Sequence, residues 1–189
     1  MGRRGDLYTY KVADMPSGSG RIAIDLGFGI TRSEVWDKED APTRGHVVES
    51  RQQGGRGAGG RGEYFLERVD GRTVRPYSYR AVVTDVVDGD TVWVEIDHGF
   101  YTTTRRKLRF RGIDAPELWT KAGEIAKSFV KEIVDAVDFM VVHTRRPDKY
   151  GRYLADLYYG IGVEDATAVA REGRYLNGEM VRRGFATTA

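Results

Sequence analysis

The middle of the chain alternates apolar and polar side chains in the pattern of a β-hairpin. Residues 92–96 alternate valine and isoleucine with tryptophan and glutamate, and residues 107–111 alternate leucine and phenylalanine with basic residues. A period of two is typical of half-buried strands. The connection, residues 98–104, contains one glycine and is short enough for a hairpin. The motif DGDTV, residues 88–92, opens this hairpin, and the motif GIDAPE, residues 112–117, follows it.

Two further elements flank the hairpin. Residues 79–87 predict a strand that leads into DGDTV. From about residue 122 to 137, apolar side chains recur at helical spacing, which predicts an amphipathic helix after GIDAPE. The apolar stripe of this helix consists of Ile125, Ala126, Phe129, Val130, Ile133, Val134 and Val137.

The remaining residues complete a mainly β pattern. Residues 139–143 predict another strand, and residues 145–159 predict a tight turn followed by a strand. Residues 160–173 have mixed character and suggest a surface insertion, and residues 176–183 predict a short helix with Asn177 as its cap. This order of elements predicts an α+β fold, a five-stranded OB-fold barrel plus helices.

Several segments of the first 78 residues are similar in sequence to segments of the later part of the chain. We interpret residues 1–78 as a degenerate, partial repeat and residues 79–189 as the complete unit, although shared strand and turn composition could also produce the match. Because so small a piece is marginal alone, we expect it to pack on the second unit or on another chain, including by self-association. The matched segments are 23–32 with 95–105, 39–42 with 113–116, and 63–74 with 127–142.

A glycine- and arginine-rich segment, residues 51–62, lies within the first part of the chain. It has too few apolar residues to offset its ordering entropy, so we expect a flexible loop. Such segments can also hold phosphates loosely.

Composition narrows the class of protein. The chain has 189 residues, of which 40% are hydrophobic and 31% charged, as expected of a globular protein. No apolar run approaches a membrane span and the first residues lack an apolar signal, so we expect a cytoplasmic protein. The absence of cysteine excludes disulfides and thiol chemistry. The formal charge of +2 does not by itself indicate a nucleic-acid partner.

Two carboxylates should meet at one end of the hairpin. Thr102, within the connection, is midway in sequence between Asp90 and Asp114, so folding the hairpin there brings them to the same end of the sheet. Such a pair suits Ca²⁺ or Mg²⁺, and Pro116 restrains Ala115 in an extended geometry that could aim its carbonyl at the same ion. The alternative is that each aspartate only caps a turn.

Three more residues could act on a phosphodiester. Glu117, just beyond the aspartates, could orient a water or take its proton, or it could be a solvated surface residue. Arg109 and Arg152, on different strands, could bind phosphate oxygens through their planar guanidinium groups. Alternatively, these arginines form ion pairs with the same carboxylates.

The order of these motifs resembles the staphylococcal nuclease, or thermonuclease-like, family. The resemblance covers residues 79 to about 186 and implies Ca²⁺ binding by Asp90, Asp114 and the Ala115 carbonyl. It further implies phosphate binding by Arg109 and Arg152, and Glu117 as general base or water positioner. The motifs that carry it are DGDTV, LRFRGIDAPE, AGEIAKSF, DKYGR and LNGEMVRRGFA.

The resemblance also implies a substrate. Lys149 and Tyr150 would lie beside its terminal phosphate, and the family hydrolyses single-stranded or frayed DNA and RNA at the 5′-oxygen, leaving 3′-phosphates. Two other functions stay open for this chain. One is a non-catalytic nucleic-acid-binding module on the same barrel, and the other is a calcium-stabilised structural domain.

Overall fold

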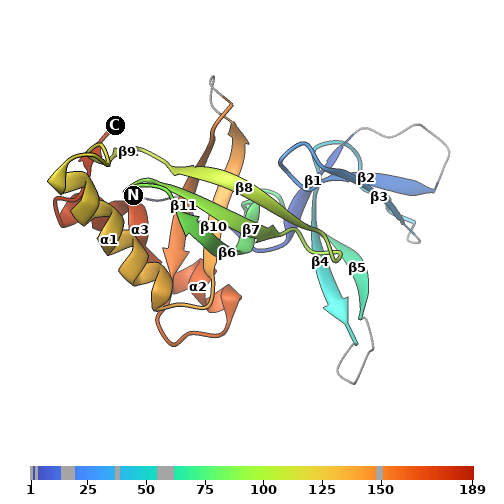
Figure 1. Ribbon diagram of the computed structural model, residues 1–189. Helices are drawn as coiled ribbons and strands as arrows, with labels where there is room; N and C mark the ends of the chain where they lie inside the picture. Colours follow the sequence, from blue (N-terminus) through green and yellow to red (C-terminus); the bar gives the residue numbers. More distant parts are fainter. Residues whose placement is uncertain (1, 3, 14–19, 37–38, 55–61, 148–150) are drawn as a thin grey trace.

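The computed structural model describes residues 2, 4–13, 20–36, 39–54, 62–147 and 151–189 (Figure 1). Residues 9–69 form a five-stranded antiparallel sheet in the order β3-β2-β1-β4-β5. Its strands are β1 (Thr9–Ala13), β2 (Arg21–Asp25), β3 (Thr31–Val35), β4 (Val47–Gln53) and β5 (Glu63–Val69). The predicted loop at 51–62 is therefore too long, because β4 runs through Gln53. Residues 55–61 of that loop lie outside the described residues.

The later strands close into a barrel. The order is β10-β6-β7-β8-β11, and an additional β10–β11 pairing joins the ends. All pairs are antiparallel except β8 with β11, which is parallel. This closed, five-stranded barrel confirms the predicted OB-type fold. Its strands are β6 (Ser78–Val86), β7 (Thr91–Asp97), β8 (Thr103–Phe110), β10 (Met140–Pro147) and β11 (Tyr153–Tyr159), and β12 (Arg174–Tyr175) adds to the edge of β11.

Helices cover the end of the barrel away from the first sheet (Figure 1). Helix α1 (Lys121–Asp135) begins at Thr120, whose side chain accepts a hydrogen bond from the Gly123 amide. Its buried face matches the predicted stripe at Ala126, Phe129 and Ile133. The prediction for Ile125 was wrong: this side chain is 47% exposed, because it lies at the edge of the buried stripe.

Near the carboxyl end, the predicted insertion contains a helix that was not predicted, and the predicted cap was wrong. The predicted insertion contains helix α2 (Ala166–Glu172), whose Val169 packs with Val141 and Tyr158 in a small apolar cluster. Asn177 does not cap helix α3 (Leu176–Arg182); it is fully buried and binds backbone groups of β11 instead. None of the helices in the described part of the chain is long and apolar enough to cross a membrane.

The first sheet pairs its strands as the barrel does. The order β3-β2-β1-β4-β5 corresponds to β8-β7-β6-β10-β11, and the register agrees, with Lys11 opposite Asp25 as Arg80 is opposite Asp97. The first sheet stays open because β3 and β5 are its two edges, and the described residues between β3 and β4 contain no helix such as α1.

The turns of the two matched hairpins have the same conformation. The Gly27 amide donates to Asp25 Oδ1 and the Gly99 amide donates to Asp97 Oδ1, both at 2.8 Å. The glycines have φ of 79° and 70°, and the phenylalanine that follows each has φ of 55° and 51°. We therefore propose that residues 1–78 are a partial repeat of the barrel unit.

One predicted segment match was wrong. Residues 63–69 form β5, which pairs with β4 as β11 pairs with β10, whereas residues 127–135 are helical. The shared apolar residues in the two segments serve different periods, two in a strand and 3.6 in a helix.

The two halves of the chain share one hydrophobic core. A shared core is what we expected if residues 1–78 pack on the second unit. Each half also binds the hairpin of the other through tyrosine hydroxyls. Three hydrogen bonds cross between the halves, from Tyr8 to Asp97 Oδ2, from Tyr10 to the His98 carbonyl and from Tyr79 to the Leu26 carbonyl, at 2.6–2.8 Å. A fourth joins Tyr77 to Asp25 Oδ2 at 3.0 Å, within the first 78 residues. Self-association through the first sheet stays a prediction.

Candidate functional site

One guanidinium group joins the two predicted aspartates. Arg109 Nη1 donates to Asp90 Oδ1 at 2.5 Å, and Arg109 Nη2 donates to Asp114 Oδ1. Arg109 lies on β8 opposite Thr91, next to the DGDT turn, and Asp114 lies on the short strand β9 (Ile113–Asp114). The structure therefore brings Asp90, Arg109 and Asp114 together, in the ion-paired arrangement that the sequence left open.

The carboxylate of Asp90 is almost completely buried, with 3% of its side chain exposed, whereas that of Asp114 is 64% exposed. Asp90 accepts hydrogen bonds from the Ala115 amide at 2.7 Å and from the Thr91 hydroxyl at 3.0 Å. Burial raises the pKa of Asp90, and these donors and the Arg109 charge oppose that effect. Asp90 is thus a buried anion that favours cationic neighbours.

Small residues allow the two motifs to approach. A side chain at Gly89 would place its Cβ 2.8 Å from the Cβ atoms of both Ala115 and Ala126. The DGDT turn, the IDAP segment and helix α1 therefore meet at a point that only glycine can occupy. This close contact keeps Asp90 within hydrogen-bonding distance of the Ala115 amide.

The end of the chain supports the same segment, which the sequence did not reveal. Strand β13 (Thr187–Thr188) pairs with β9, placing Thr187 opposite Asp114, and the Thr187 hydroxyl donates to the Asp114 carbonyl. The Ala189 amide donates to the Gly112 carbonyl. Asp114 is held on a paired strand, not on a free turn.

Glu117 is exposed and lies in the turn that leads into α1. Its carbonyl accepts hydrogen bonds from the amide and hydroxyl of Thr120, the N-cap residue. Gly123 packs so tightly that a Cβ atom there would overlap the Glu117 carbonyl group. Gly123 thus positions Glu117 through backbone contact, a role that the helical pattern of the sequence did not indicate.

Arg152 is exposed and directly precedes β11. Leu154 pairs with Arg109 in the parallel pairing of β11 with β8, and Arg152 is two residues before Leu154. Arg152 therefore lies close in sequence to the strand that adjoins Arg109. Lys149 and Tyr150, the predicted substrate-binding residues, lie outside the described residues.

Asn177 is a supporting residue that the sequence assigned wrongly. Its amide group donates to the carbonyls of Arg111 and Ala155, and its carbonyl accepts from the Leu157 amide. It therefore ties helix α3 to β11 and to the end of β8, the two strands that carry or adjoin the candidate arginines.

The donor set fits a hard cation. Asp90, Asp114 and the Ala115 carbonyl offer oxygen ligands in one short region, and Ca²⁺ completes its coordination with water. Among the described residues, no group of three or more acidic, histidine or cysteine side chains is close enough to hold a metal. A cation here would therefore rely on two carboxylates that now share Arg109.

Comparison with known families matches one part of the chain. Residues 107–189 match the model of the family described as staphylococcal nuclease homologue, whereas no curated protein matches the chain. The match begins within β8, so Asp90 lies before it, but two hydrogen bonds join Asp90 to the matched residues Arg109 and Ala115. Together with the closed barrel, this match shows that residues 107–189 are similar to the staphylococcal nuclease homologue family.

Proposed function

We propose that the protein is a calcium-dependent phosphodiesterase. Its substrates would be single-stranded or frayed DNA and RNA, cleaved at the 5′-oxygen to leave 3′-phosphates. The observation that supports this most is that one arginine, Arg109, contacts both Asp90 and Asp114. Asp114 lies three residues before Glu117. Arg109, Asp114 and Glu117 lie within residues 107–189, which match the staphylococcal nuclease homologue family.

Asp90, Asp114 and the Ala115 carbonyl would hold the calcium ion. When bound, the ion would polarise the phosphate and lower the pKa of a coordinated water. The raised pKa of Asp90 means that its anionic form is costly without a cation, which favours cation binding at this position.

The side chains around this position would do the remaining work. Glu117, exposed at the turn before α1, would accept the proton of the attacking water. Arg109 has five N–H donors, more than its two carboxylate contacts use, so it can also donate to phosphate oxygens. Arg152 would hold the same phosphate from its position directly before β11, and Lys149 and Tyr150 would contact a terminal phosphate.

The test is cleavage of a labelled single-stranded DNA with calcium and then with chelator. Glu117→Gln should lower kcat by about 10²–10⁴-fold, the usual contribution of a general base, and leave binding nearly unchanged. Glu132→Gln, an exposed glutamate on the opposite part of α1, is the matched control. Absence of calcium-dependent cleavage by the folded protein would exclude the proposal.

A non-catalytic nucleic-acid-binding module is the second candidate. It is favoured by the lack, among the described side chains, of a cluster of three acidic groups that could hold a metal. Binding of oligonucleotide that calcium does not change, with no products after long incubation, would support it over the nuclease.

A further inference from the structure

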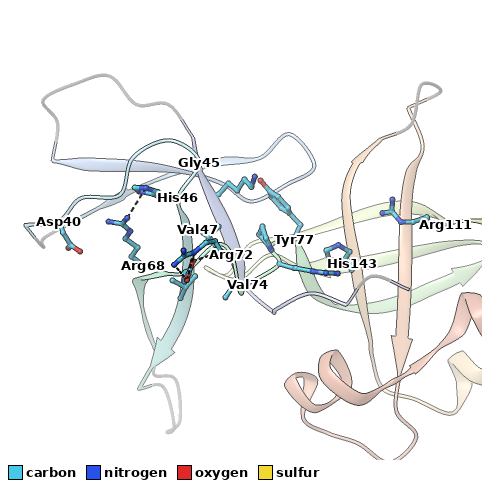
Figure 2. Close-up of a pocket in the computed structure, with 16 residues that line it drawn as sticks. Asp40, Gly45, His46, Val47, Arg68, Arg72, Val74, Tyr77, Arg111 and His143 are labelled. Atoms are coloured by element: carbon cyan, nitrogen blue, oxygen red, sulfur yellow. Dashed lines mark hydrogen bonds and ion pairs between the residues drawn. The ribbon is translucent and has the colours of Figure 1, made fainter. Parts of the chain in front are cut away.

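A large cavity lies between the first sheet and the barrel (Figure 2). Its volume is about 1370 Å³, above the range of roughly 300–1,000 Å³ that is usual for small-molecule pockets. The labelled side chains in Figure 2 come from both halves, with His46, Arg68 and Arg72 on the first sheet side and His143 and Arg111 on the barrel. The cavity therefore exists only because the partial repeat packs on the barrel.

The cavity lining carries an excess of positive charge. Five cationic side chains, Lys11, Arg68, Arg72, Arg75 and Arg111, face two carboxylates. Arg72 pairs with Asp70 and Arg111 pairs with Asp156, each at 3.0 Å.

The other three cationic side chains in the lining form no ion pair among the described residues. Within the described part of the chain, no carboxylate lies within ion-pair distance of the side chains of Lys11, Arg68 or Arg75. Arg68 instead contacts the ring of His46, with 3.4 Å between Nη2 and Nε2. At Arg109, by contrast, two carboxylates neutralise the arginine.

The three unpaired cations come from separate segments, β1, β5 and the link between the halves. An extended polyanion can contact all three at once, whereas a single small anion would use one or two of them. Arginine binds phosphate oxygens through paired N–H groups, and such contacts release counterions from a nucleic-acid strand.

We propose that this cavity binds the phosphodiester backbone of a single-stranded nucleic acid, as a second anchoring site apart from the cleavage site. The proposal rests on the proposed function only in its choice of polyanion. Strands long enough to reach the cavity gain affinity from it, and a dinucleotide bound at the cleavage site does not.

The experiment measures binding of a fluorescent single-stranded 20-mer to the full chain in chelator, where no calcium-dependent cleavage occurs. The cavity variant is Lys11→Gln, Arg68→Gln and Arg75→Gln together. The control removes three charges from the helices, Lys127→Gln, Lys131→Gln and Arg171→Gln. Circular dichroism establishes that both variants are folded.

The cavity variant should bind the 20-mer at least about tenfold more weakly than the control variant at 0.1 M salt. The slope of log K against log [salt] should fall by about 2, since each lost phosphate contact removes about 0.7 for a single strand. Cleavage of a dinucleotide in calcium should stay unchanged in the cavity variant.

Equal losses in the two variants would overturn the proposal, because they would show an effect of net charge alone. Tighter binding of inorganic tripolyphosphate than of the 20-mer would also overturn it, in favour of a free polyphosphate site. Cavity-dependent binding without any cleavage would support the anchoring site and contradict the nuclease. Cleavage of the 20-mer that the cavity substitutions leave unchanged would support the nuclease and contradict the anchoring site.

Discussion

Asp90 is a buried carboxylate in the candidate site. Its carboxylate accepts from a backbone amide, a hydroxyl and a guanidinium, so every nearby donor is arranged for the anion. Burial nevertheless raises its pKa. An acid with a raised pKa loses its charge at a higher pH than an ordinary aspartate, so cation binding here should weaken early as the pH falls.

The prediction for Asp90→Asn concerns calcium-dependent stability. The wild-type protein should gain about 2.7 kcal/mol when calcium reaches a hundred times its Kd, because the ion binds the folded state only. Asp90→Asn should abolish this gain, and Asp135→Asn, on the exposed end of α1, should retain it. Thermal unfolding with calcium and with chelator measures the effect. An equal calcium response in both variants would contradict a metal site at Asp90.

Among the elements, the two matched hairpins have turns that contact the other half of the chain. Each turn needs positive φ at the first glycine, and each presents a backbone carbonyl to a tyrosine of the other half. The turn of the first hairpin has a second glycine, Gly29, at φ of 76° with no atom near its side-chain position. Gly27 and Gly29 therefore share the backbone constraint but differ in their surroundings.

Gly27→Ala should destabilise the protein more than Gly29→Ala. The substitution at Gly29 should cost about 1–2 kcal/mol for the left-handed backbone alone. At Gly27 the new Cβ atom would overlap the Tyr79 hydroxyl, so a further cost of about 1–2 kcal/mol should come from displacing its hydrogen bond to Leu26. Urea unfolding of both variants gives the difference. Equal costs would show that the tyrosine moves freely.

In the whole molecule, the two halves of the chain share one hydrophobic core. Tyr10→Phe and Tyr79→Phe each remove a hydroxyl from a fully buried tyrosine that bonds the opposite hairpin. Each should cost about 1–2 kcal/mol, because a buried carbonyl loses the tyrosine hydroxyl as a donor, although the Leu26 carbonyl keeps its contact with His98. Tyr101→Phe, at a half-exposed position, should cost less. Urea unfolding followed by tryptophan fluorescence and by circular dichroism should give one shared transition; separate transitions would contradict a common core.

The contact between halves should also make stability depend on pH. His98 is fully buried, donates through Nδ1 to the Leu26 carbonyl, and packs near Asp97 and Arg106. Burial lowers the pKa of His98, so below pH 6.5 the unfolded chain binds a proton that the folded chain does not. Stability is therefore full above this pH and falls as the pH drops from 6.5 toward the lower folded pKa.

His98→Gln should reduce this dependence, with the free energy of unfolding changing less between pH 7.5 and 5.5 than in the wild-type protein. One proton accounts for at most about 1.4 kcal/mol per pH unit. His46→Gln, at a partly exposed histidine, is the control for replacing a histidine. An unaltered slope in His98→Gln would assign the pH dependence to other groups.

The sequence by itself determined the local elements. Alternation in residues 92–96 and 107–111 defined the central hairpin, and the apolar spacing of Ala126 to Ile133 defined α1, because these patterns require only neighbours along the chain. It also indicated that Asp90 and Asp114 meet, since a hairpin has a fixed geometry between its ends.

The tertiary structure decided what depends on distant partners. No local pattern indicates that β8 pairs in parallel with β11, that Thr187 supports Asp114, or that Asn177 binds β11 instead of capping α3. The first sheet likewise stays open although its strands pair in the barrel's order, because closure requires its two edge strands to meet. These features arise when segments far apart in the chain pack around one core, and their sequence signal is spread over the whole molecule.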